Sequence, residues 1–201
     1  MQRVIVPTHY TRAASEPQQA DALVIKPEGA LTLLRRCGAV VGESGLGSAD
    51  ESQLPIPVSR LNTQFSEAEK NPPVISYLAT LLVGQADMLI PQVDAFCGVP
   101  DGGVVLAFAL ARYCNCRYKC LECNMAGGLQ FGWHVLTTES VVLVKDAVLD
   151  NDAYIHQVIR VVEENDGAIL GIFCVYNAHG EKDFHGVPIT SLLMLEKRKK
   201  G

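Results

Sequence analysis

SVVLVKDAVLDNDAYIHQVIRVV, residues 140–162, contains a change of periodicity that predicts a strand followed by a helix. The apolar run 141–144 favours a buried strand that ends on Lys145 and Asp146. After a short polar stretch, residues 149–152, apolar residues recur at helical spacing. In an α/β protein such a junction lies at the carboxyl edge of the sheet, where ligands bind. This junction is rich in aspartate and has no glycine, so it is poorly suited to holding a phosphate.

The rest of the chain alternates between strand and helix patterns. Strands are predicted over 92–99, 117–123, 140–146, 168–177 and 187–195, with an edge piece at 54–58, and helices over 27–37, 72–89, 100–114 and 152–166. Residues 125–134 are expected to form a glycine-rich loop. This alternation predicts a mostly parallel sheet with helices on both faces. We expect one α/β domain over residues 23–201, preceded by a flexible extension over residues 1–22.

The composition of the 201 residues is that of an ordinary globular protein, with 48% hydrophobic and 19% charged residues. The formal net charge of −5 argues against binding to nucleic acid or to a membrane surface, because no basic field covers the chain. The basic run at 197–200 favours a solvated tail, and a weak polyanion contact is the alternative. No apolar run approaches the roughly 18 residues of a membrane span.

The expected location is the cytoplasm. The first fifteen residues lack the apolar segment of a secretory signal. Seven cysteines, an odd number, then indicate reduced thiols in an intracellular protein. The absence of acids before Glu16, together with Arg3 and Arg12, leaves a mitochondrial or other organelle location as the alternative.

Four cysteines lie within ten residues: Cys114, Cys116, Cys120 and Cys123. Four thiolates could complete a zinc site, but such sites usually take two pairs from separated turns. The pattern therefore favours free, partly buried thiols over a metal site.

A glycine-rich turn, CGVPDGGVVLAFALA at residues 97–111, joins the first predicted strand to its helix. Glycines allow the backbone to approach a ligand, and the helix N-terminus offers unpaired N–H groups to an anion. Gly98, Asp101, Gly102 and Gly103 are the candidate ligand-binding residues. The alternative is a tight turn packed for structural reasons.

The order of these segments resembles the type I phosphoribosyltransferases, and within them the orotate phosphoribosyltransferases. GVPDGG with its apolar helix, VVLVKDAVLDND, and the closing VPITSLLML occur in the family's order, and the resemblance covers residues 30–196. It implies a Rossmann-like, phosphoribosyltransferase-type fold. It also implies that the earlier loop holds the pyrophosphate of phosphoribosyl pyrophosphate (PRPP). The later acidic pair would hold the ribose hydroxyls, and the loop after it the 5-phosphate.

The resemblance assigns ligand-binding positions to the junction quoted first: Lys145, Asp146, Val148, Leu149, Asp150, Asn151 and Asp152. Asp146 is the candidate catalytic residue and a candidate magnesium ligand. His134 is a second catalytic candidate, because it is the one cationic candidate in the segment that matches the family's catalytic loop. A lone histidine in a loop is also commonly structural.

Several positions depart from the family pattern. Lys145 stands where the first acid belongs, and Asp150 and Asp152 replace the hydroxyl and glycine residues of the phosphate loop. No lysine or arginine lies between Lys119 and Lys145, and residues 46–55 lack the lysines that contact the base and pyrophosphate in the family. Carboxylates beside a phosphate repel it, by about 1 kcal/mol in water and several times that in a partly dry pocket.

These departures favour a non-catalytic phosphoribosyltransferase-like protein that acts as a subunit or interaction module. The resemblance implies a homodimer or a place in a larger assembly, and no cofactor is expected. The alternative is an active, divergent transferase that uses PRPP, magnesium and a pyrimidine-like base such as orotate. It would place Asp146 on the ribose and residues 98–103 on the pyrophosphate, with a cation supplied from outside or by a partner.

Overall fold

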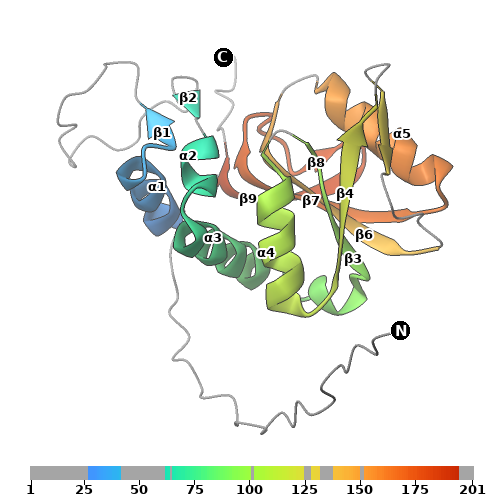
Figure 1. The fold of residues 1–201 in the computed structure, drawn as a ribbon, viewed down its shortest axis with the longest axis horizontal. Coiled ribbons are helices and arrows are strands. Elements are labelled where there is room, and N and C mark those ends of the chain that lie inside the picture. Colours follow the sequence, from blue (N-terminus) through green and yellow to red (C-terminus); the bar gives the residue numbers. More distant parts are fainter. Residues whose placement is uncertain are drawn as a thin grey trace, which may run out of the picture.

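The computed structural model describes residues 27–41, 62–63, 65–100, 102–124, 128–131, 138–149 and 152–194 (Figure 1). The predicted extension 1–22, the edge piece 54–58 and the basic run 197–200 lie outside these ranges, as do the candidate residues Asp101, His134, Asp150 and Asn151. None of the helices in the described ranges has the length and apolarity that crossing a bilayer requires.

The main sheet has seven strands: β3 (Ala95–Gly98), β4 (Arg117–Cys123), β5 (Leu129–Phe131), β6 (Ser140–Val148), β7 (Ala168–Asn177), β8 (Asp183–Phe184) and β9 (Val187–Met194). Their order is β5-β4-β3-β6-β7-β9-β8. The five central strands are parallel, whereas β5 and β8 pair antiparallel at the two edges. The expected mostly parallel sheet is confirmed, and the prediction of a loop throughout residues 125–134 is wrong for β5.

The helices are α1 (Pro27–Arg36), α2 (Phe65–Glu69), α3 (Pro72–Gln85), α4 (Val104–Cys114) and α5 (Ala153–Glu164), with a short 3₁₀ turn at Ile90–Gln92 and a separate antiparallel pair of strands, β1 (Val40–Val41) and β2 (Asn62–Thr63). Helix α3 starts at two prolines, whose missing N–H groups are not needed in the first turn. The four longer helices were predicted from their apolar spacing, whereas α2 was not.

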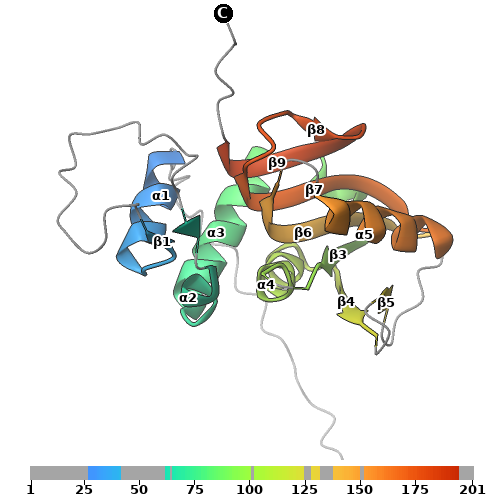
Figure 2. The same cartoon turned by 90° about the horizontal axis from the view of Figure 1, so that it is seen from above.

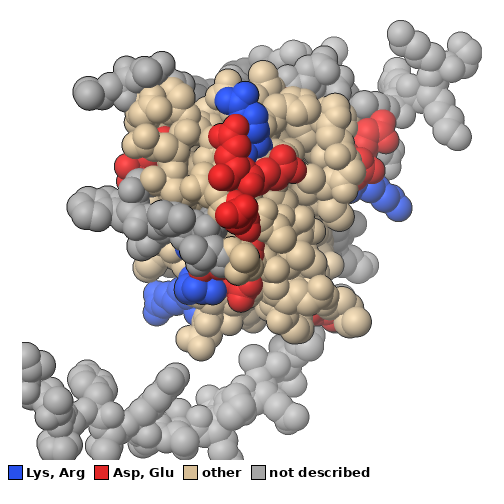
Figure 3. Space-filling model, turned by 90° about the vertical axis from the view of Figure 1, so that its right-hand side faces the viewer, with Lys and Arg blue, Asp and Glu red and all other residues tan. Residues whose placement is uncertain are grey.

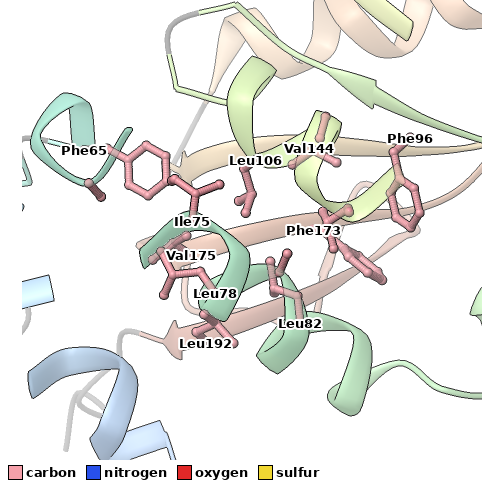
Figure 4. Packing of buried hydrophobic residues seen from close by; sticks show 14 of the residues in the cluster. Phe65, Ile75, Leu78, Leu82, Phe96, Leu106, Val144, Phe173, Val175 and Leu192 are labelled. Carbon is pink, nitrogen blue, oxygen red and sulfur yellow. The ribbon is translucent and has the colours of Figure 1, made fainter. Parts of the chain in front are cut away.

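Two apolar cores lie on opposite faces of the sheet. The first is packed by α1, α2, α3 and α4 against alternate strand residues, among them Phe96, Phe173 and Leu192 (Figure 4). The second is packed by α5, which buries Ile155 and Val158 against the other face. Figure 2 shows α5 on the side of the sheet away from α3 and α4, so the expected covering of both faces is confirmed. Full burial of each such side chain contributes about 1.5–3 kcal/mol.

Strand β6 continues beyond the apolar run that predicted it. Ala147 and Val148 pair with Tyr176 and Asn177 of β7, so the ladder extends two residues past the predicted end at Asp146. Successive residues of a strand point to opposite faces, so Lys145 and Asp146 point to opposite faces of the sheet. Lys145 lies on the α5 face, and Asp146 lies on the α4 face.

Candidate functional site

The loop between β3 and α4 packs against strand β6 at the carboxyl edge of the sheet. The N–H of Val99 donates to the carbonyl of Val144 at 2.9 Å, and the N–H of Gly103 donates to the carbonyl of Val99 at 3.1 Å. A Cβ at position 103 would lie 1.9 Å from the Val144 carbonyl oxygen, so only glycine fits there. The alternative that the glycine-rich turn is packed for structural reasons is therefore confirmed for Gly103.

Asp146 lies against the same loop on the α4 face. Gly102 has a φ of +113°, and a Cβ on it would lie 2.5 Å from the Asp146 carboxyl carbon. Burial, and then the charge of Asp146, raise the pKa of Glu69, at the end of α2. Two carboxylates from distant parts of the chain are thus near enough for their charges to interact.

Lys145 lies on the opposite face and points into the protein. Its ammonium donates to the carbonyl of Ala147 at 3.0 Å and to Asp152 Oδ2 at 3.1 Å. The side chains of the ion pair are only 12% and 5% exposed, for lysine and aspartate respectively. The lysine that stands where the resemblance expects an acid is therefore paired with an internal carboxylate.

Asp152 caps α5 and closes the loop that precedes it. Its Oδ1 accepts the N–H of Ile155 at 3.1 Å, and its Oδ2 accepts the N–H of Leu149 at 3.4 Å. Aspartate is a favoured N-cap residue, so the sequence also allows Asp150 and Asp152 a helix-capping role, and Asp152 has that role in the structure. Val148 is buried, whereas the side chain of Leu149 is half exposed at the rim of the loop. One N–H group in the first turn of α5 and one in the loop before it thus donate to a carboxylate of the chain itself.

The four clustered cysteines do not converge. Cys114 ends α4, Cys116 lies in the following turn, and Cys120 and Cys123 are three residues apart in β4. Within the described ranges, no three His, Cys, Asp or Glu side chains come close enough to hold a metal ion. Burial raises the pKa of the Cys114 thiol to about 11, which favours a protonated thiol.

Sequence reasoning missed Glu69. It lies in a five-residue helix within a polar stretch, where no apolar periodicity indicates a helix and nothing links the residue to β6. Only the packing of α2 brings its carboxylate to the edge of the sheet.

Charge is unevenly distributed on the face drawn in Figure 3. Acidic side chains form a row down the centre of this face, and the basic ones are few and separated. Among the described residues visible there, no continuous basic surface exists for a nucleic-acid backbone to follow.

No family model matches this chain, but individual known proteins are similar to it in sequence. The orotate phosphoribosyltransferase of Caldicellulosiruptor bescii is 30% identical over 106 residues, 52% of this chain and 55% of that protein. The orotate phosphoribosyltransferase of Thermotoga maritima is 29% identical over 82% of this chain and 83% of its own length. The transcriptional regulator GfcR of Archaeoglobus fulgidus is 24% identical over 88% of this chain and 86% of its own length. The chain thus spans about half the length of the first relative and most of the other two.

Solved structures agree with these sequence matches. Orotate phosphoribosyltransferase from Aeropyrum pernix superposes with a TM-score of 0.62 at 19% identity, covering 83% of this chain and 94% of that one. Adenine phosphoribosyltransferase from Rhodothermus marinus gives 0.57 at 14% identity, covering 84% and 99%. The chain is therefore a protein of the type I phosphoribosyltransferase fold, similar in sequence to the orotate phosphoribosyltransferases.

Proposed function

We propose that this orotate phosphoribosyltransferase-like domain has lost the phosphate site for PRPP and acts without catalysis, as a subunit or interaction module. The observation that carries the proposal is the position of the Asp152 carboxylate. It accepts the N–H of Ile155 in the first turn of α5 and the N–H of Leu149 in the loop before it, where the family resemblance places the 5-phosphate of PRPP.

A phosphate at this helix N-terminus would have to displace the carboxylate or lie beside it. Two unit charges 4 Å apart repel by about 1 kcal/mol in water and about 4 kcal/mol at the effective dielectric of a protein surface. A phosphate monoester carries more than one charge, so the penalty is larger. Asp152 is nearly buried and doubly hydrogen-bonded, which makes its displacement costly as well.

Lys145 stabilises the Asp152 carboxylate in this position by pairing with it. An acid at this position on the α5 face would repel Asp152, whereas the lysine neutralises it at 3.1 Å. Lys119, on the same face, is likewise paired with the buried carboxylate of Glu139 at 2.5 Å. Both of these ammonium groups are thus committed to internal carboxylates and are not presented to a departing pyrophosphate.

A role without transfer chemistry is supported by one of the relatives, although the others named above are transferases. One protein similar along most of this chain is named a transcriptional regulator and not a transferase. Such a domain would bind a protein partner through its surface, while the Asp152 carboxylate takes the place of the phosphate at the carboxyl edge of the sheet. We place this role on a single domain over residues 23–201.

Isothermal titration calorimetry tests the proposal. The purified chain is titrated with PRPP in the presence of magnesium, and orotate is added afterwards. We expect no heat of binding up to millimolar PRPP. Micromolar binding would overturn the proposal. As a positive design, Lys145→Asp combined with Asp152→Thr restores the family's residue types, and we expect this double variant to bind PRPP more tightly than the parent chain.

The second candidate is an active transferase with altered substrate preference, favoured by the two carboxylates at the carboxyl edge. Asp146 stands beside Gly102, where a ribose hydroxyl could be held, and Glu69 adds a second carboxylate from α2. Carboxylate oxygens are the ligands that magnesium prefers. In this case PRPP binds with micromolar affinity, Asp146→Asn abolishes the binding, and orotate with PRPP and magnesium yields pyrophosphate.

A further inference from the structure

Three histidine rings surround the ring of Phe184 in β8. The ring centres of His156 and His185 each lie 4.9 Å from that of Phe184, and the ring centre of His179 lies 5.4 Å from it. Phe184 is fully buried in the core that α5 covers, whereas His156 and His185 are exposed. The rings of His156 and His185, which we call the histidine pair, also contact each other, with their centres 4.3 Å apart. An exposed pair of imidazoles thus joins α5 to the β8–β9 hairpin.

His185 occupies a backbone position that is uncommon for a residue other than glycine. It forms the two-residue turn between β8 and β9 together with Gly186, because Phe184 and Val187 pair on either side of them. Their φ angles are +52° and +85°, and positive φ at both positions is the pattern of a type I′ turn, which favours asparagine, aspartate and glycine. The N–H of Gly186 donates to Asp183 Oδ1 at 3.1 Å and holds the turn. The hairpin therefore presents an imidazole where other residue types fit the backbone more easily.

The spacing of the histidine pair matches that of two imidazoles bound to one metal ion. With a metal–nitrogen bond of about 2.0–2.1 Å, the centre of an imidazole ring lies roughly 3.2 Å from the metal. Two such rings at a right angle about the ion have centres roughly 4.5 Å apart, and at the tetrahedral angle roughly 5.2 Å apart. The observed 4.3 Å is nearest to the right-angle value. Both side chains are exposed, so each can rotate to direct a ring nitrogen to a shared ion.

We propose that the histidine pair binds a divalent transition-metal ion, and that nickel(II) and copper(II) are the ions that fit it. Imidazole is a ligand for zinc, copper and nickel, but ligands at right angles are typical of copper(II) and nickel(II), whereas zinc prefers a tetrahedral site. Within the described ranges, no third His, Cys, Asp or Glu converges with the pair, so water completes the coordination. Magnesium prefers oxygen ligands and does not fit these two nitrogens.

A bound ion would join two elements that are distant in sequence. His156 lies in the first turn of α5, and His185 lies at the tip of a hairpin whose strand β8 has only two residues. A ligand that binds only the folded state stabilises it, so the ion should hold this short edge hairpin against α5. The inference goes beyond the proposed function, because neither histidine is among the residues to which the resemblance assigns a ligand.

Isothermal titration calorimetry of the full chain, without an affinity tag, with nickel chloride measures the binding. We expect one nickel ion per chain with micromolar affinity. His185→Asn retains a residue type that suits the turn, and both this variant and His156→Gln should bind nickel at least tenfold more weakly. His179→Gln is the matched control, because it removes the third imidazole beside Phe184, and it should bind as the parent chain does. No binding up to millimolar nickel, or unchanged binding in His156→Gln and His185→Asn, would overturn the proposal.

Two further measurements distinguish the histidine pair from other sites. Cys123→Ser removes the exposed thiol and should leave the nickel affinity unchanged; loss of binding in this variant would assign the ion to cysteine and refute the site. Nickel should also slow amide hydrogen exchange in the β8–β9 turn of the parent chain, and it should have no such effect in His185→Asn. Equal exchange with and without nickel in the parent chain would show that the ion does not join the two elements. No PRPP is present in these experiments, so their outcome is independent of the proposed function.

Discussion

The Lys145–Asp152 ion pair should respond unequally to removal of its two partners. Replacing Asp152 with alanine removes the cap of α5 and leaves the Lys145 ammonium buried, with the carbonyl of Ala147 as its one remaining acceptor among the residues that the structure describes. Replacing Lys145 with methionine leaves the carboxylate held by the N–H groups of Leu149 and Ile155. The aspartate also gains from the positive end of the helix dipole, whereas the lysine has no comparable support.

The magnitudes follow from burial and hydrogen bonding. Loss of an N-cap aspartate costs about 1 kcal/mol, and removing one partner of a buried ion pair costs about 3–5 kcal/mol. We therefore expect Asp152→Ala to lower the free energy of unfolding by about 3–5 kcal/mol. Lys145→Met should lower it by about 1–2 kcal/mol, because the carboxylate keeps two charge-assisted hydrogen bonds. Asp152→Asn retains the cap and should fall between the two.

Urea unfolding followed by circular dichroism at neutral pH measures these differences, provided that the denaturant dependence stays the same among the variants. The combination of Lys145→Met with Asp152→Asn should cost less than the sum of the single changes, because one interaction is lost only once. If Lys145→Met proved as destabilising as Asp152→Ala, the backbone N–H groups would not be the main support of the carboxylate. The proposal that Asp152 takes the place of the 5-phosphate would then fail.

Two further predictions concern positions where the packing leaves little freedom. Gly103→Ala should destabilise the fold by about 3 kcal/mol or more, because its Cβ would overlap the Val144 carbonyl; Gly84→Ala, in an open position of α3, should instead stabilise it by about 0.5–1 kcal/mol in the same urea assay. Burial raises the pKa of the Cys97 thiol to about 12, so this thiol stays protonated at about pH 8. Cys97 should therefore resist a thiol reagent until the protein unfolds, whereas the exposed Cys123 should react at once. Equal labelling rates at the two cysteines would contradict the buried position of β3.

The sequence alone determined the five central parallel strands and the four longer helices. The apolar residues of β6 and β7 form continuous runs of the length of a buried strand, and those of α5 recur with the period of a helix. Periodicity is a property of neighbouring residues and is therefore visible without the fold. The alternation of these segments then predicted a mostly parallel sheet, and it placed the two candidate loops at one edge.

Short edge elements could not be predicted in this way. Strand β5 has three residues and β8 has two, which is too few to show a period. Each exists because β4 or β9 offers an unpaired row of hydrogen-bonding groups beside it. The extension of β6 past Asp146 has the same origin, since the long buried strand β7 supplies its partner.

The chemistry at the carboxyl edge likewise depended on tertiary structure. The sequence showed that Lys145 and Asp152 depart from the family pattern, but not that they pair with each other. It contained no sign that Glu69 would approach Asp146 from a distant helix. Side-chain partners that are far apart in sequence are chosen by the packing of whole elements, whereas local periodicity records only which face of each element is buried.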